Sequence, residues 1–299
     1  KCQSYGYRCC YGAGEILMKA LRICWQNVRK WGGNRRIWML IILSILSVHL
    51  YTRGLWDICS YVGEPMSPWI FPFLFIFRYM KIEFMIPLVF IFCDAPFVDS
   101  NQMYVMLRTD RTTWGIGQVL YIFAGSFFYM FVLMMSTIVL NIGHIKWDNT
   151  WGNVLGLAGT STVQTVLGHA TDTVKVLGIV IKYFTPVQAM FFSALLMWLS
   201  FVLTGLIIYV FNIITGTKFI GVCVASFFII FTAVADGKSM ITRVSPMSWN
   251  SLNNIDIGGM TEYPGIVYVL TLYIVMIVVL SVIAVAAGRK TSINSSDEV

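Results

Sequence analysis

Few side chains in this sequence have the type and spacing that catalysis or metal binding requires. The three histidines, His49, His144 and His169, lie far apart, and no His-Glu-x-x-His motif places two of them on one helical face. Residues 237–239 (Gly-Lys-Ser) end like a phosphate-binding loop, but Thr232 stands where the first glycine of that motif belongs. No Gly-x-Ser-x-Gly elbow is present to position a serine nucleophile. We therefore expect no catalytic site, metal site or cofactor in this chain itself.

The composition is that of a protein embedded in a membrane. Hydrophobic residues make up 58% of the 299 positions and charged residues 12%, whereas soluble domains carry about 25% charged residues. The net charge of +7 is explained by basic loops on one side of a membrane, and we expect no nucleic-acid partner. The seven cysteines show no Cys-x-x-Cys spacing, which argues against a disulfide framework.

Apolar stretches divide the chain into three parts. Residues 1–36 predict a cytoplasmic N-terminal segment, residues 37–287 a transmembrane domain, and residues 288–299 a polar cytoplasmic tail. The expected fold is an all-α membrane protein with about six transmembrane helices, near 37–51, 69–93, 118–140, 187–210, 219–235 and 266–287. The sequence assigns no role to the two long outer loops, 141–186 and 236–265.

The second apolar stretch is the one that carries ionisable side chains. Arg78, Lys81 and Glu83 fall within it, and charges at this depth are costly unless they are paired or hydrated. Residues 69–80 could form an outer-leaflet or re-entrant piece, which we favour, or the span could be tilted with its charges facing a cavity. The three charges are candidate pathway residues, and Glu83 has Arg78 and Lys81 as possible partners.

The segment 15–31 predicts a basic amphipathic helix on the membrane surface. Leu17, Leu21, Cys24, Val28 and Trp31 recur at spacings of four and three, and basic side chains occupy the other face. Two glycines at 32–33 end the pattern. The candidate membrane-surface residues are Lys19, Arg22, Trp25, Arg29, Lys30 and Trp31.

The distribution of Lys and Arg predicts the orientation. With the N-terminus inside, 13 of these residues fall in inner segments and six in outer segments, while Arg78 and Lys81 lie within a span. The excess predicts that both termini lie in the cytoplasm.

The polar interval after the second span carries a family resemblance. Residues 93–126 contain an acid and Pro-Phe at the span exit, a short helix, paired arginines, and then Trp and Gly opening the next span. This pattern resembles the corresponding loop in ATP-binding-cassette (ABC) exporter permeases of the second type, particularly small ones from Gram-positive bacteria. The six-span layout and the amphipathic helix are similar to that family as well. The charged second stretch and the long loop 141–186 depart from it.

The resemblance implies a permease subunit that forms the substrate path of an exporter and hydrolyses no ATP itself. A separate ATPase subunit would bind ATP and Mg, and a second permease copy or a paralogue would complete the complex. A cytoplasmic coupling helix would dock on that ATPase through Tyr104, Leu107, Arg108, Arg111 and Trp114. Asp94 and Pro96 would fix the exit from the second span. An aromatic, apolar path suits an amphipathic or hydrophobic cargo.

Two other functions remain open from the sequence. A secondary carrier or channel would use the charged second span, although the later spans lack the midplane carboxylates that such carriers usually need. An integral-membrane enzyme acting on lipid would use the two outer loops. The residues that could serve that enzyme are His144, Asp148, His169 and Asp172.

Overall fold

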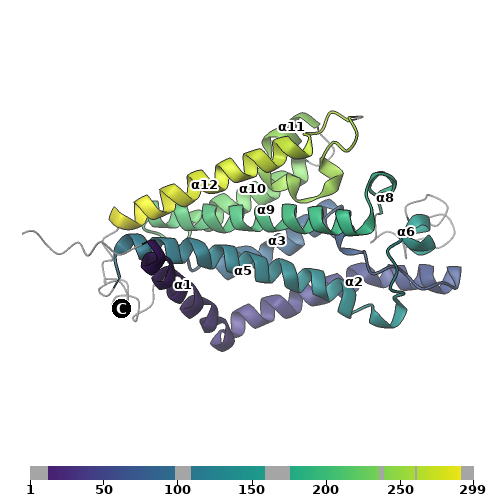
Figure 1. Ribbon diagram of the computed structural model, residues 1–299, viewed down its shortest axis with the longest axis horizontal. Helices are drawn as coiled ribbons and strands as arrows, with labels where there is room; N and C mark the ends of the chain where they lie inside the picture. The colour runs from purple at the N-terminus through teal and green to yellow at the C-terminus, as the bar shows by residue number, and fades with distance from the viewer. Residues whose placement is uncertain (1–12, 98–108, 159–175, 236–238, 260, 291–299) are drawn as a thin grey trace, which may run out of the picture.

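The computed structural model describes residues 13–97, 109–158, 176–235, 239–259 and 261–290 (Figure 1). These residues form no β-strand and only two isolated bridges. The helices are α1 (Ala13–Arg29), α2 (Arg35–Val62), α3 (Arg78–Phe92), α5 (Arg111–Val139), α6 (Gly152–Ala158), α8 (Gly178–Tyr183), α9 (Pro186–Thr215), α10 (Ile220–Ala235), α11 (Ser239–Val244) and α12 (Ile266–Lys290).

Four helices, α2, α5, α9 and α12, are long and apolar enough to cross a membrane. The prediction of an all-α membrane protein is therefore confirmed. The count of six crossings stays a prediction, because α3 has 15 residues and the apolar part of α10 covers Ile220–Thr232. At about 1.5 Å per residue, α3 is about 22 Å long, which is shorter than a hydrocarbon core of about 30 Å.

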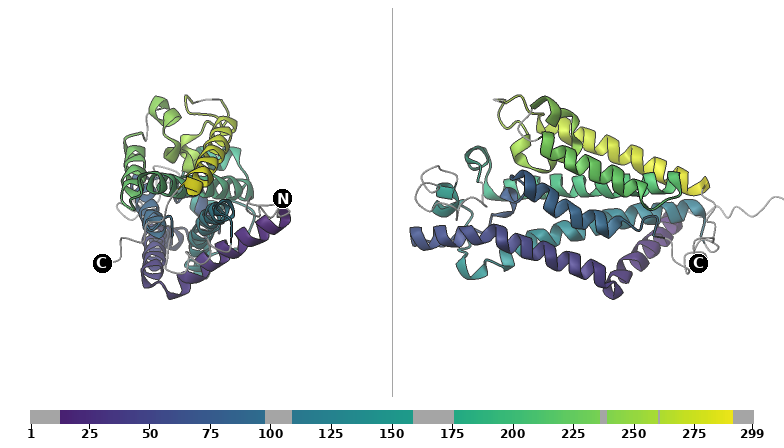
Figure 2. Two further views of the ribbon diagram at one scale, coloured as in Figure 1. Left: turned by 90° about the vertical axis from the view of Figure 1, so that its left-hand side faces the viewer. Right: turned by 180° about the vertical axis from the view of Figure 1, so that it is seen from behind.

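The bundle has two chemically different ends. In Figures 1 and 2, α2, α3, α5, α9, α10 and α12 lie side by side and run in alternate directions. One end, which we call the basic end, holds α1, the start of α2, residues 93–97, the start of α5, and the α9–α10 turn. Ten of the described Lys and Arg residues lie there: Lys19, Arg22, Arg29, Lys30, Arg35, Arg36, Arg111, Lys218, Arg289 and Lys290. The opposite end holds the C-terminal turns of α2, the loops around α6 and α8, and residues 245–259.

Two of the long helices extend beyond their predicted spans. α2 was expected to end near residue 51 but continues to Val62, and α5 begins at Arg111 instead of residue 118. Packing explains both extensions. Trp56 of α2 donates to Asn141 Oδ1 (2.7 Å) at the opposite end, while the first turns of α5 contact α1 and α12.

The predicted second span differs from a continuous helix over 69–93. Its helical part begins only at Arg78, and the residues before it form turns around a short 3-10 helix, Phe71–Phe73. This segment is nevertheless buried, with the side chains of Ile70 and Leu74 inaccessible to solvent. A non-helical backbone is tolerated at membrane depth only where protein covers it and satisfies its polar groups.

A second buried non-helical segment, residues 245–255, enters the bundle from the opposite end. It contains the 3-10 turns Pro246–Asn250 and Leu252–Asn254 and packs mainly on α9. Met247 lies within hydrogen-bonding distance of the Thr204 hydroxyl in α9 (3.3 Å), and Thr204 also contacts Met85 of α3 (3.8 Å). The two non-helical segments therefore flank the middle of α9.

Buried tyrosine hydroxyls hold these irregular backbones in place. Tyr51 donates to the carbonyl of Phe73, and Tyr273 donates to the carbonyl of Pro246, both at 2.7 Å. Tyr129 donates to the carbonyl of Phe84 (2.9 Å) in α3, the helix that contains Pro87. These hydroxyls therefore link the irregular segments and α3 to α2, α5 and α12.

Replacing Tyr273 with Phe should destabilise the bundle by about 1–2 kcal/mol, because the buried hydrogen bond from its hydroxyl to the Pro246 carbonyl is lost. The matched control is Tyr209→Phe, since the Tyr209 hydroxyl is buried without a hydrogen-bond partner among the described residues. Thermal unfolding of the detergent-solubilised protein, followed by size-exclusion chromatography, measures both. Equal melting temperatures for the two variants would contradict this role.

Candidate functional site

Helix α1 packs along the first half of α5 and forms one wall of the site. The close approach depends on Gly117, where a Cβ would lie 2.8 Å from the side chain of Ile23. Two buried hydrogen bonds fix the register: Asn27 Nδ2 donates to Gln118 Oε1 (2.9 Å), and Trp31 Nε1 donates to the hydroxyl of Tyr121 (2.7 Å). α1 is therefore part of the bundle as well as amphipathic.

The apolar residues of α1 divide between two faces, which corrects the single face expected from the sequence. Cys24 and Trp31 face α5 and are buried, and burial raises the pKa of the Cys24 thiol. Leu17, Leu21 and Trp25 point outward, and Trp25 is 67% exposed. One apolar stripe therefore packs on α5, and the other is exposed on the surface of the chain.

The basic side chains of α1 lie between these stripes. Arg22, Arg29 and Lys30 are exposed, and Lys19 forms an ion pair with Glu15 one turn earlier (3.0 Å). The helix ends where expected, at the 3-10 turn Lys30–Gly33, and the chain then bends sharply into α2 (Figures 1 and 2).

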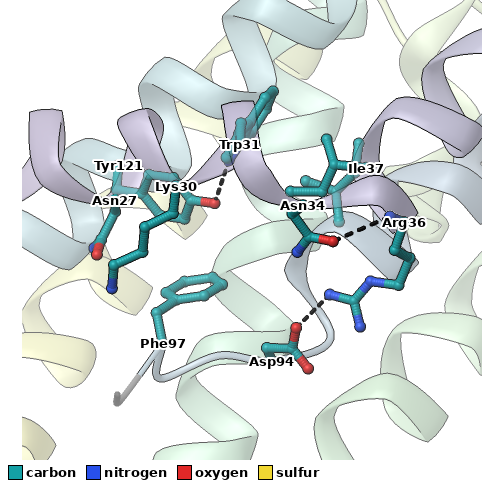
Figure 3. A pocket seen from close by; sticks show the side chains of 10 residues that line it. Asn27, Lys30, Trp31, Asn34, Arg36, Ile37, Asp94, Phe97 and Tyr121 are labelled. Atoms are coloured by element: carbon teal, nitrogen blue, oxygen red, sulfur yellow. Dashed lines mark hydrogen bonds and ion pairs between the residues drawn. The ribbon is translucent and has the colours of Figure 1, made fainter. Parts of the chain in front are cut away.

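The bend between α1 and α2 encloses a cavity of about 100 Å³, which we call the elbow pocket (Figure 3). Asn34 caps α2 by accepting from the backbone N–H of Arg36 (3.1 Å). Arg36 Nη2 in turn forms an ion pair with Asp94. The pocket is lined by Asn27, Lys30, Trp31, Asn34, Arg36, Ile37, Ile91, Asp94, Phe97 and Tyr121.

The chain just after α3 is also hydrogen-bonded to α9, through a side chain that in turn binds α10. Asn212 in α9 is 1% exposed, and its Nδ2 donates to the carbonyl of Ala95 (2.9 Å). Its Oδ1 accepts from the backbone N–H of Gly221 in α10 (2.8 Å). A Cβ at Gly221 would lie 2.3 Å from the carbonyl of Ile208, so only glycine fits there. One amide therefore joins α3, α9 and α10 at the basic end.

The predicted coupling residues occupy different environments. Asp94 faces Arg36, and Pro96 follows Ala95 through a cis peptide bond. Arg111 begins α5, and its Nη1 donates to the carbonyl of Arg289 in α12 (3.1 Å). Trp114 is 2% exposed and lies beside Gly288 of α12, so its ring is not on the surface of this chain. The remaining three, Tyr104, Leu107 and Arg108, and with them the predicted coupling helix, lie outside the described residues.

Two of the candidate pathway charges, Lys81 and Glu83, lie on different faces of α3, and the side chain of Arg78 is outside the described part of the structure. Arg78 is the first residue of α3, Lys81 is 1% exposed within the bundle, and Glu83 points away from it. Two residues along a helix correspond to about 200° of rotation, which places Lys81 and Glu83 on opposite faces. Within the described part of the chain, no ion pair joins them.

The opposite end groups two of the histidines around Trp56. The rings of His144 and His49 lie 5.0 and 5.2 Å from its ring. Asp148 contributes a backbone carbonyl that accepts from Trp69 Nε1 (2.8 Å), whereas His169 and Asp172 lie outside the described residues. The residues that the structure describes contain no group of His, Cys, Asp and Glu that could hold a metal ion.

Replacing Asn212 with Ala should lower stability by roughly 2–4 kcal/mol, because a buried carbonyl and a buried N–H lose their partner together. Ser193→Ala in the same helix is the control, since its buried hydroxyl has no partner among the described residues. Unfolding temperatures of the two purified variants give the comparison. A melting curve for Asn212→Ala that matches Ser193→Ala would show that the joint is not structurally important.

Sequence reasoning identified the chain segments of this site but missed Arg36, Tyr121 and Asn212. Arg36 stood in the sequence as an ordinary basic residue before the first span, and nothing in its neighbours indicated Asp94 as its partner. Asn212 could have been found, because an amide side chain within an apolar run commonly forms hydrogen bonds between helices. The chain matches no family model, no curated protein and no solved structure.

Proposed function

We propose that this chain is the membrane subunit of an ABC exporter of the second type, working with a separate ATPase that binds ATP and Mg. The observation that carries the proposal is the loop after α3. Residues 93–126 resemble the coupling region of such permeases, and the beginning of that loop is bonded directly to α2 and α9. Asp94 pairs with Arg36 of α2, and the Ala95 carbonyl is held by Asn212 of α9, which also binds α10.

These bonds supply what mechanical coupling requires. A permease without an ATPase receives work through a cytoplasmic loop, and that loop must be rigidly attached to the helices that line the path. The Asp94–Arg36 pair is partly exposed, so its energy is small, about 0–1 kcal/mol. The buried amide of Asn212 is the stiffer link, because it loses two hydrogen bonds when it separates.

The proposed location is a bacterial inner membrane with both termini in the cytoplasm. The concentration of Lys and Arg at the basic end supports that end as the cytoplasmic one. A second permease copy or a paralogue would pair with the chain.

A secondary carrier is the competing function, and the buried Lys81 favours it. A cation inside a bundle of apolar helices commonly marks an ion or substrate path. Substrate flux in liposomes without ATP would support a carrier and oppose the exporter.

The coupling residues can be tested by replacing Tyr104, Leu107 and Arg108 together with Ala. The tagged protein, purified from cells of its native host, should bring down an ATPase activity that this variant loses by about tenfold or more, because its docking contacts are removed. Lys146→Ala/Lys182→Ala at the opposite end is the control and should retain the activity. If wild-type protein brings down no ATPase, the exporter proposal fails; if the variant keeps it, the docking residues lie elsewhere.

Reporter fusions test the orientation. Green fluorescent protein fused after Val299 should fluoresce, because it folds in the cytoplasm, whereas alkaline phosphatase inserted after Asp148 should be active outside it. The reverse pattern would place the basic end outside and remove the support that charge gives to the proposal.

A further inference from the structure

The elbow pocket combines features of a binding site that the proposed function does not use. Its wall is polar on two sides: Figure 3 shows Lys30 on one side and Arg36 with Asp94 on the other. Trp31, Tyr121 and Phe97 form the aromatic part of the lining, with Phe97 packed against Tyr121 (ring centres 4.7 Å apart). A cavity of about 100 Å³ is large enough for a group the size of a phosphate.

The hydrogen bonding of Arg36 points to a missing acceptor. Its Nη2 is occupied by Asp94, but its Nε is buried and has no hydrogen-bond partner within the described residues. A buried donor without an acceptor is unfavourable, and a guanidinium binds oxyanions well through its fork of N–H groups. The Nε itself is covered by protein, but the Arg36 side chain is 39% exposed overall, so an anionic oxygen in the pocket would bind the accessible N–H groups of its guanidinium.

The charge of the pocket also selects an anion. Lys30 and Arg36 supply two positive charges and Asp94 one negative charge, so the residues that line the pocket carry a net charge of +1. Arg29 and Arg35 are exposed on either side of the bend and add to the positive potential. A cation would meet repulsion here.

The surroundings of the pocket identify the source of that anion. Immediately before the bend, Trp25 and Leu21 of α1 are exposed, and immediately after it Trp38 and Met39 of α2 are exposed as well. Apolar and aromatic side chains on both sides of a basic bend are typical of the boundary between lipid headgroups and acyl chains. Basic pockets at this level, between helices, commonly bind lipid headgroups.

We propose that the elbow pocket binds the phosphate of an anionic phospholipid, with Lys30 Nζ and the guanidinium of Arg36 as its donors. The acyl chains would lie along the exposed apolar residues of α1 and α2. Because α1, α2 and the exit of α3 all line the pocket, the bound headgroup would fix the bend between them. The proposal requires the membrane location but is independent of any ATPase.

The test is lipid binding by native mass spectrometry of the delipidated protein, titrated with phosphatidylglycerol and, separately, with phosphatidylcholine. We expect tighter binding of phosphatidylglycerol, and a five- to tenfold loss of that affinity in Lys30→Gln, since one Lys near an anionic lipid surface contributes about 1 kcal/mol. Arg29→Gln is the control, because Arg29 is exposed one residue away but does not line the pocket. Lys30→Arg keeps the charge and should keep the affinity.

Three outcomes would overturn the proposal. Equal losses in Lys30→Gln and Arg29→Gln would mean that surface charge in general attracts the lipid. Equal binding of the two lipids would mean that the site does not select an anion. Stabilisation of the wild-type protein by 10 mM inorganic phosphate, about as large as that by the lipid, would make the site one for free phosphate. A size-exclusion profile that matches wild type would show that Lys30→Gln is folded. Failure of the protein to bind an ATPase would contradict the exporter proposal but would not change the measured affinity for phosphatidylglycerol.

Discussion

The backbone carbonyls of non-helical segments inside the bundle are the constraint on which the rest of this structure depends. Residues 66–77 and 245–255 both contain side chains buried in the bundle, and each includes only short 3-10 turns in place of an α-helix. Tyr51 and Tyr273 donate to one carbonyl in each segment. Each tyrosine is wholly buried, so its ring fills the core while its hydroxyl adds a hydrogen bond between a long helix and the irregular segment.

This arrangement makes α9 the centre of the molecule. It contacts α3, α5, α10 and α12, and both irregular segments pack against it. Phe201 of α9 lies against Phe75 and Tyr129 on one side (ring centres 6.1 and 5.3 Å apart), while Thr204 meets Met247 on another. Gly205 allows the approach, because a Cβ there would lie 2.6 Å from Ile122. The helix with the least exposed surface is thus the one that positions the others.

Hydropathy predicted the order of the apolar segments and the N-terminal amphipathic helix, because both depend on local periodicity. It did not predict where α3 begins, since residues 69–77 are as apolar as a helix would be. Trp114 illustrates the same limit. An aromatic residue at a polar boundary suggests an exposed position, but Trp114 is 2% exposed and its ring lies against Gly288 of the distant helix α12. The joint at Asn212 binds backbone atoms of residues 95 and 221, which no side-chain pattern can indicate.

The Asn212 joint also determines how the hairpin of α9 and α10 can move. The two helices are connected by a short turn through Gly216, which has a left-handed backbone (φ 69°), and the amide locks that turn at the basic end. A rigid body held at one end rotates about that point. α9 has 30 residues and is about 45 Å long, so a rotation of about 5° would displace its far end by about 4 Å. Displacements too small to break a hydrogen bond at the basic end are therefore amplified at the start of α9, near Pro186.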